Sequence, residues 1–104
     1  MKPLNLPNEA IVIRIIFSLK AQAQLVEHAA FIYDQSKNVD IADAYLDKMR
    51  DYISSTLSRF PKAGRPSDEI IENSRKLVYQ GFSIIYSIES EHIEILLIYR
   101  ENLL

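Results

Sequence analysis

Residues 75–100 decide the fold of this chain, and they read RKLVYQGFSIIYSIESEHIEILLIYR. Three short apolar runs rich in Ile, Val and Tyr are separated by two polar links, Gln80-Gly81 and Ser90-Glu91. Runs of this length with two-residue links are typical of antiparallel strands joined by tight turns. The stretch therefore predicts a three-stranded meander in the last third of the chain.

Two amphipathic helices are expected before the meander. Ser18 can cap the first helix, which should run to about Lys37. Asn38-Val39 breaks the pattern, and Asp40 is the expected N-cap of a second helix, which ends at Pro61 because proline lacks an N–H. The apolar stripe of the first helix is expected to contain Leu25, Val26, Ala29, Ala30, Ile32 and Tyr33. That of the second should contain Ile41, Tyr45, Met49, Tyr52, Ile53, Leu57 and Phe60.

The remaining segments complete an α+β fold in one domain, residues 1–104. Residues 1–9 are expected to form an arm, and Ile11–Phe17 a strand whose nearly continuous apolar character predicts burial on both faces or a covering partner. Residues 61–73 read as a loop, with a short strand at Glu69–Ile71. The expected order is β-α-α-β-β-β, with the helix hairpin packed on one face of an antiparallel sheet.

Composition argues against several classes of protein. The net charge is −2, and because proteins that grip nucleic acid usually have a basic surface, we expect no direct nucleic-acid binding. The chain has no cysteine, which fits the cytoplasm and excludes disulfides and thiolate chemistry. His28 and His92 are isolated, so we expect no metal and no other cofactor. No apolar run approaches the roughly 18 residues that a membrane-spanning helix needs.

These residues, in this order, resemble the RelE/ParE family of bacterial toxin–antitoxin systems. The resemblance covers about Ile11 to Arg100. Its pieces are AQLVEHAAFIY in the first helix, the Phe60-Pro61 helix end, the Gly64-Arg65 loop, and the strand sequences RKLVY, FSIIY and IEILLI. The resemblance implies the fold described above and a toxin that a cognate antitoxin neutralises.

The family divides by target, and the chain looks more like the ParE branch. Ribonuclease members cleave messenger RNA on the ribosome with a cluster of Arg, Lys and Tyr or His. They commonly carry an arginine where Ser83 follows Phe82 here, and residues 101–104 add no basic or tyrosine side chain. Members of the ParE branch have a longer helix hairpin and no evident active site, and are generally taken to poison DNA gyrase. The resemblance thus implies a protein that is not an enzyme and inhibits gyrase by contact.

Six side chains are candidates for contacts with the target or the antitoxin, and none is assigned as catalytic. Each also has an ordinary structural interpretation. Arg65 can pair with Asp68 or Glu69, and tyrosines on strands pack without a function. Adjacent strand residues face opposite sides of a sheet, so only one of Arg75 and Lys76 can face a given partner. The candidates are Arg65, Arg75, Lys76, Tyr86, Tyr99 and Arg100.

Two other functions stay open from the sequence alone. One is a ribosome-dependent endoribonuclease of the RelE type, with Arg65, Arg75, Lys76 and Arg100 as its cations. The other is an inactive family member that only binds its antitoxin. The apolar surplus of Ile11–Phe17 and Ile95–Tyr99 predicts a protein partner, such as an antitoxin segment that adds a strand or lays a helix in a groove. A homodimer and a toxin–antitoxin hetero-oligomer both fit the sequence.

Overall fold

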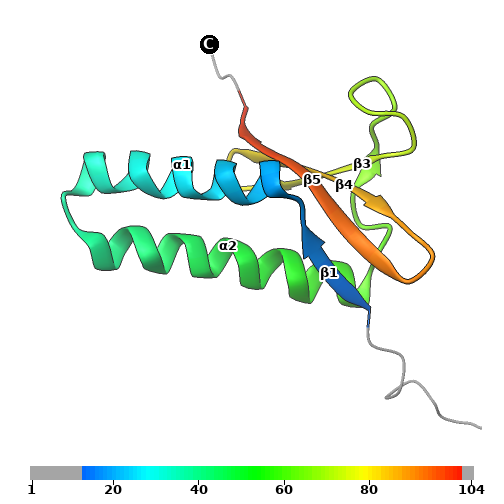
Figure 1. Ribbon diagram of the computed structural model, residues 1–104, viewed down its shortest axis with the longest axis horizontal. Coiled ribbons are helices and arrows are strands. Elements are labelled where there is room, and N and C mark those ends of the chain that lie inside the picture. The colour runs from blue at the N-terminus through cyan, green and yellow to red at the C-terminus, as the bar shows by residue number, and fades with distance from the viewer. Residues whose placement is uncertain (1–12, 102–104) are drawn as a thin grey trace, which may run out of the picture.

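The chain folds as two helices on a five-stranded mixed sheet. The computed structural model describes residues 13–101. Its elements are β1 (Arg14–Phe17), α1 (Leu19–Ser36), α2 (Val39–Arg59), β2 (Arg65–Pro66), β3 (Arg75–Tyr79), β4 (Phe82–Ile88) and β5 (His92–Arg100). The strand order is β1-β5-β4-β3-β2, with β1 parallel to β5 and every other pair antiparallel. The antiparallel helices lie side by side, and their turn extends past the sheet (Figure 1). The predicted helix hairpin on one face of a sheet is confirmed, but the sheet is mixed and not wholly antiparallel, because β1 pairs in parallel with β5.

The two tight turns of the meander lie where the sequence predicts them. Gln80 and Gly81 both have positive φ, 47° and 86°, as a two-residue hairpin turn of the mirror-image type requires. At the other turn the N–H of Glu89 donates to the carbonyl of His92 at 2.8 Å and closes Ser90-Glu91. Local sequence therefore sets the register of β3, β4 and β5 next to each turn.

A bulge in β5 brings three isoleucines into the core. Ile85 pairs with Leu97 but Tyr86 pairs with Ile95, so β5 carries one extra residue, Leu96. One extra residue shifts the alternation of side chains from one face to the other. As a result Ile93, Ile95 and Ile98 are all buried. The bulge accounts for part of the apolar surplus that the sequence shows in this strand.

The core lies between the sheet and the nearer halves of both helices. Its helical contributors include Leu25 of α1 and Met49, Ile53 and Leu57 of α2, as the apolar spacing predicts. The predicted stripes were wrong near the helix turn, which extends beyond the sheet, at the opposite end of α2, and along one side of α1. The exposed exceptions are Val26, Ala30, Tyr33, Ile41 and Phe60.

Strand β1 is covered on one face and not on both, because the two helices lie on the same side of the sheet. Ile15 and Phe17 pack against the core, whereas Arg14 and Ile16 are exposed. Residues 11 and 12 of the predicted strand, and the predicted arm at 1–9, lie outside the described residues. The strand predicted at Glu69–Ile71 is wrong: that segment is a turn, and Arg65–Pro66 pair with β3 instead.

Asn38, and not Asp40, caps the second helix. Its Oδ1 accepts hydrogen bonds from the N–H groups of Asp40 and Ile41, at 2.9 and 3.2 Å. Asn38 and Asp40 are both good capping residues, so propensity alone could not choose between them. Asp40 instead lies in the first turn, where its charge favours the helix dipole.

Asn38→Ala is expected to lower the free energy of unfolding by about 1 kcal/mol, because two backbone donors lose their acceptor. Asp40→Ala removes only the weaker interaction with the dipole and should cost clearly less. Urea unfolding followed by circular dichroism measures both variants. An equal or larger loss for Asp40→Ala would contradict the assignment of the cap.

Candidate functional site

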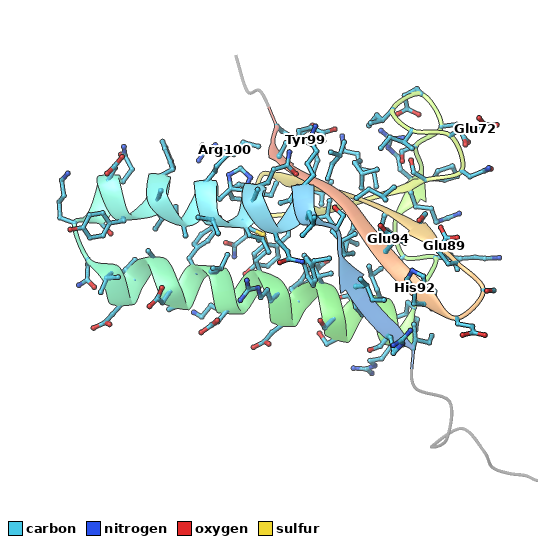
Figure 2. All side chains as sticks on the ribbon, in the orientation of Figure 1. Glu72, Glu89, His92, Glu94, Tyr99 and Arg100 are labelled. Carbon is cyan, nitrogen blue, oxygen red and sulfur yellow. The ribbon has the colours of Figure 1, made fainter. Side chains whose placement is uncertain are left out.

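The six candidate residues do not form one site. Arg75 and Tyr86 turn inward toward the loop after α2, while Arg65, Lys76 and Tyr99 lie on the face of the sheet that carries no helix. Arg100 ends β5 beside α1, next to Tyr99 (Figure 2). The candidates thus fall into three places: Arg75 and Tyr86 inside the protein, three residues on the helix-free face, and Arg100 on a separate surface beside α1.

Tyr86 and Arg75 hold the loop between α2 and β2. Tyr86 is fully buried, and its hydroxyl donates to the Pro61 carbonyl at 2.7 Å and accepts from the Gly64 N–H at 2.9 Å. The Nε of Arg75 donates to the Gly64 carbonyl at 2.7 Å. Because Tyr86 has neither exposed area nor a free hydroxyl, we remove it from the set of contact residues, and Arg75 has a structural role.

On the helix-free face, two cations are neutralised by two carboxylates. Arg65 pairs with Glu69 at 3.0 Å, and Lys76 pairs with Glu101 at 3.1 Å. Arg65 and Lys76 are direct neighbours across β2 and β3, so the four charges form one cluster. The hydrogen bond from Lys76 lowers the pKa of Glu101. This contribution to stability is therefore present at neutral pH and is lost as the pH falls through the lowered pKa.

Ser83 lies beside this cluster, in the row of the sheet that contains Tyr99. The two residues are paired across β4 and β5, and Val78 lies opposite Ser83 on β3. The hydroxyl of Ser83 is buried beside the Glu101 carboxylate and helps to lower the pKa of Glu101, although its geometry falls short of a regular hydrogen bond. The residue that follows Phe82 is therefore small and buried, and it has no charge to offer a phosphate.

The second surface is a groove between the helices and the β3–β4 turn, which we call the hairpin groove. The Arg100 guanidinium lies 5.0 Å from the centre of the Phe31 ring and 5.8 Å from that of Phe82. The Tyr45 ring packs edge-on against Phe82. Burial raises the pKa of Tyr45, and the positive charge of Arg100 acts in the opposite direction. A hollow in this groove is lined by Ile41, Ala44, Tyr45, Lys48, Tyr79 and Gln80.

Sequence reasoning found Arg100 but missed the side chains around it. The sequence assigns no role to Phe31 and predicts Ile41 and Tyr45 on the apolar stripe of α2. Tyr45 packs against the core as predicted, whereas Ile41 is exposed. Lys48 follows Tyr45 by three residues and Ile41 by seven, so it stands on the apolar stripe of α2. A cation in that position was the available sign that this part of the stripe is not buried.

Neither histidine belongs to a metal site. His28 bonds through Nε2 to the Ile98 carbonyl at 3.0 Å, and His92 lies 3.5 Å from Glu94 (Figure 2). Within the described part of the chain no cluster of three His, Cys, Asp or Glu side chains could hold an ion. No helix between residues 13 and 101 is long and apolar enough to cross a membrane.

Comparison with known families decides the family. The model of the ParE toxin of type II toxin–antitoxin systems matches residues 15–102. The chain belongs to the ParE toxin family. It is a toxin component of a type II toxin–antitoxin system. No curated protein matches the chain.

Two solved structures share the fold of this ParE-family toxin. The chromosomal ParDE system of P. aeruginosa aligns with a TM-score of 0.74 and 22% identity, over 88% of this chain and 98% of that one. The RelBE2 toxin–antitoxin complex of Mycobacterium tuberculosis aligns with a TM-score of 0.64 and 18% identity, over 88% and 93% of the two chains. At these identities the likeness establishes the fold and not the target.

Proposed function

We propose that this ParE-family toxin acts in the cytoplasm by binding DNA gyrase and trapping its cleaved-DNA intermediate, without chemistry of its own. Cleavage of RNA needs a group that activates the ribose hydroxyl and free cations that stabilise the charged phosphate in the transition state. The paired cations of the helix-free face carry the proposal: Arg65 and Lys76 are each bound to a carboxylate. Because the carboxylates offset the positive charge of this face, it is poorly suited to stabilise the charge on an RNA phosphate.

We propose that the antitoxin occupies the hairpin groove. The hollow of the groove is lined by Lys48 and by no acidic side chain, and Arg100 lies beside it, over the rings of Phe31 and Phe82. A groove of this kind fits an amphipathic segment with an acidic face, whose apolar side chains would cover Phe31 and Tyr45. Type II toxins are held inactive by such a partner, and the antitoxin segment would order as it binds.

A supercoiling assay with purified gyrase tests the target. The toxin should inhibit supercoiling and accumulate covalently cleaved DNA. The antitoxin would neutralise the toxin by covering the surface that contacts gyrase, so Arg100 is also the proposed gyrase contact. Arg100→Ala is therefore expected to weaken inhibition by at least about tenfold, the effect of losing one exposed contact worth roughly 1.4 kcal/mol. Lys20→Ala, which removes an equally exposed cation at the start of α1, is the control and should behave like the wild type. Full inhibition by Arg100→Ala would remove Arg100 from the contact surface.

A second function, ribosome-dependent cleavage of messenger RNA, is favoured by one observation. The sheet register brings Arg65 and Lys76 together on the face that also carries Tyr99. If gyrase is unaffected, cleavage of ribosome-bound messenger RNA that is lost in Lys76→Ala would establish this function. If neither activity exists but the antitoxin binds tightly, the chain is an inactive member of the family.

A further inference from the structure

A second apolar surface, which we call the tip, lies at the end of the molecule away from the helix turn. The end of α2, the start of β1 and the β4–β5 turn meet there (Figure 1). Ile13, Pro61, Ile88 and Ile93 line an open hollow of about 230 Å³. Beside it Phe60 is 61% exposed, and Ile88 is 41% exposed. Large apolar side chains gathered on an exposed surface indicate a contact with another protein.

The backbone that carries Phe60 is fixed before any partner binds. Pro61 and Gly64 are both bonded to the buried Tyr86 hydroxyl, and Arg75 donates to the carbonyls of Gly64 and Lys62 at 2.7 and 3.4 Å. An aromatic side chain on a fixed backbone loses little conformational entropy when it is buried in an interface. Phe60 therefore has the properties of an interface anchor.

Opposite charges border the tip on its two sides. Arg59 and Lys62 lie on the α2 side, and Glu89 and Glu91 lie on the β4–β5 turn. All four residues are exposed. The tip thus has one basic and one acidic margin around an apolar centre, and these four charges cancel.

We propose that the tip is a homodimer interface between two copies of this chain. A two-fold axis beside the hollow would set the acidic margin of each copy against the basic margin of the other. Phe60, which lies within the basic margin between Arg59 and Lys62, would then insert into the apolar hollow of the second copy. Contacts of this symmetry require a surface that is complementary to itself, and the tip has that pattern. An acidic antitoxin segment would be repelled by Glu89 and Glu91, whereas a dimer formed at the tip leaves both hairpin grooves free. The inference does not depend on the identity of the target.

Sedimentation equilibrium of the full chain between micromolar and millimolar concentration tests the proposal. The wild type should show a reversible monomer–dimer equilibrium, and Phe60→Ala should weaken dimerisation by at least about tenfold. Val26→Ala, which truncates an apolar residue of similar exposure elsewhere, should leave the equilibrium unchanged. A wild type that stays monomeric throughout overturns the proposal, as does equal weakening by both variants.

Charge reversal separates this interface from any other dimer. Arg59→Glu with Lys62→Glu makes the tip acidic throughout, and Glu89→Lys with Glu91→Lys makes it basic throughout. Each double variant alone should be monomeric because like charges oppose, and an equimolar mixture should form a heterodimer. All four positions are exposed, so unchanged melting temperatures verify the fold. Double variants that dimerise alone as the wild type does, or a mixture that remains monomeric, would overturn the interface.

Discussion

Gly64→Ala is expected to destabilise the protein by about 3 kcal/mol, because overpacking against a backbone that cannot move is costly. A Cβ at this position would lie 2.6 Å from the Lys76 carbonyl oxygen, 2.8 Å from the carbonyl carbon and 2.9 Å from a ring atom of Tyr86. The first two are backbone atoms of β3, which pairs with β2 on one side and β4 on the other, and the third belongs to a fully buried ring. In a domain of this size the melting temperature should fall by roughly 15 °C.

Gly81→Ala is the matched comparison, since Gly81 is required by its positive φ and not by close neighbours. Gly81 has φ of 86°, and a Cβ there would meet nothing within 4 Å. Its substitution costs only backbone strain, about 1–2 kcal/mol. Calorimetric melting of both variants should therefore rank Gly64→Ala as the more destabilised. The reverse order would mean that the loop shifts away from β3 at little cost, and that Gly64 is not held as tightly as its contacts indicate.

Local sequence predicted most of the fold because each signal acts over a short range. Turn residues at 80–81 and 90–91, the Ser18 cap and the Pro61 stop all fix structure through their nearest neighbours. The errors arose where tertiary structure decides. Phe60 and Ile41 fit an apolar stripe, but the sheet is too short to cover the ends of α2. Similarly, the alternation in β5 could not reveal a bulge at Leu96, which only the pairing with β4 requires.

The candidate site was less predictable, since the role of a side chain depends on which face of the sheet it lies on and which side chains surround it. Residue type marked Arg65, Lys76 and Arg100 as cations, but only the register shows two of them paired with carboxylates and the third over an aromatic ring. The position of Arg75 suggested contact with a partner, although its donors satisfy carbonyls of the neighbouring loop. Cations on strands are thus ambiguous until the sheet is assembled.

Tyr86→Phe is expected to cost about 2–3 kcal/mol, although it removes one oxygen atom and no packing surface. The Gly64 N–H would lose its partner in a buried place, where an unsatisfied group costs about 1–3 kcal/mol. The half-buried Pro61 carbonyl would lose a hydrogen bond that water can partly replace. Tyr33→Phe removes a hydroxyl from a side chain that is 44% exposed, and it should stay within about 0.5 kcal/mol of the wild type in urea unfolding.

The same variant tests whether Tyr86 positions the tip or contacts a target. Freed from one of its two anchors, the turn that carries Phe60 should become more mobile, and dimerisation should weaken because ordering that turn then adds to the cost of association. Gyrase inhibition at a temperature well below melting should be retained, since a fully buried side chain cannot touch gyrase. Loss of inhibition by folded Tyr86→Phe, with dimerisation intact, would instead return Tyr86 to the contact surface and place the target near the loop between α2 and β2.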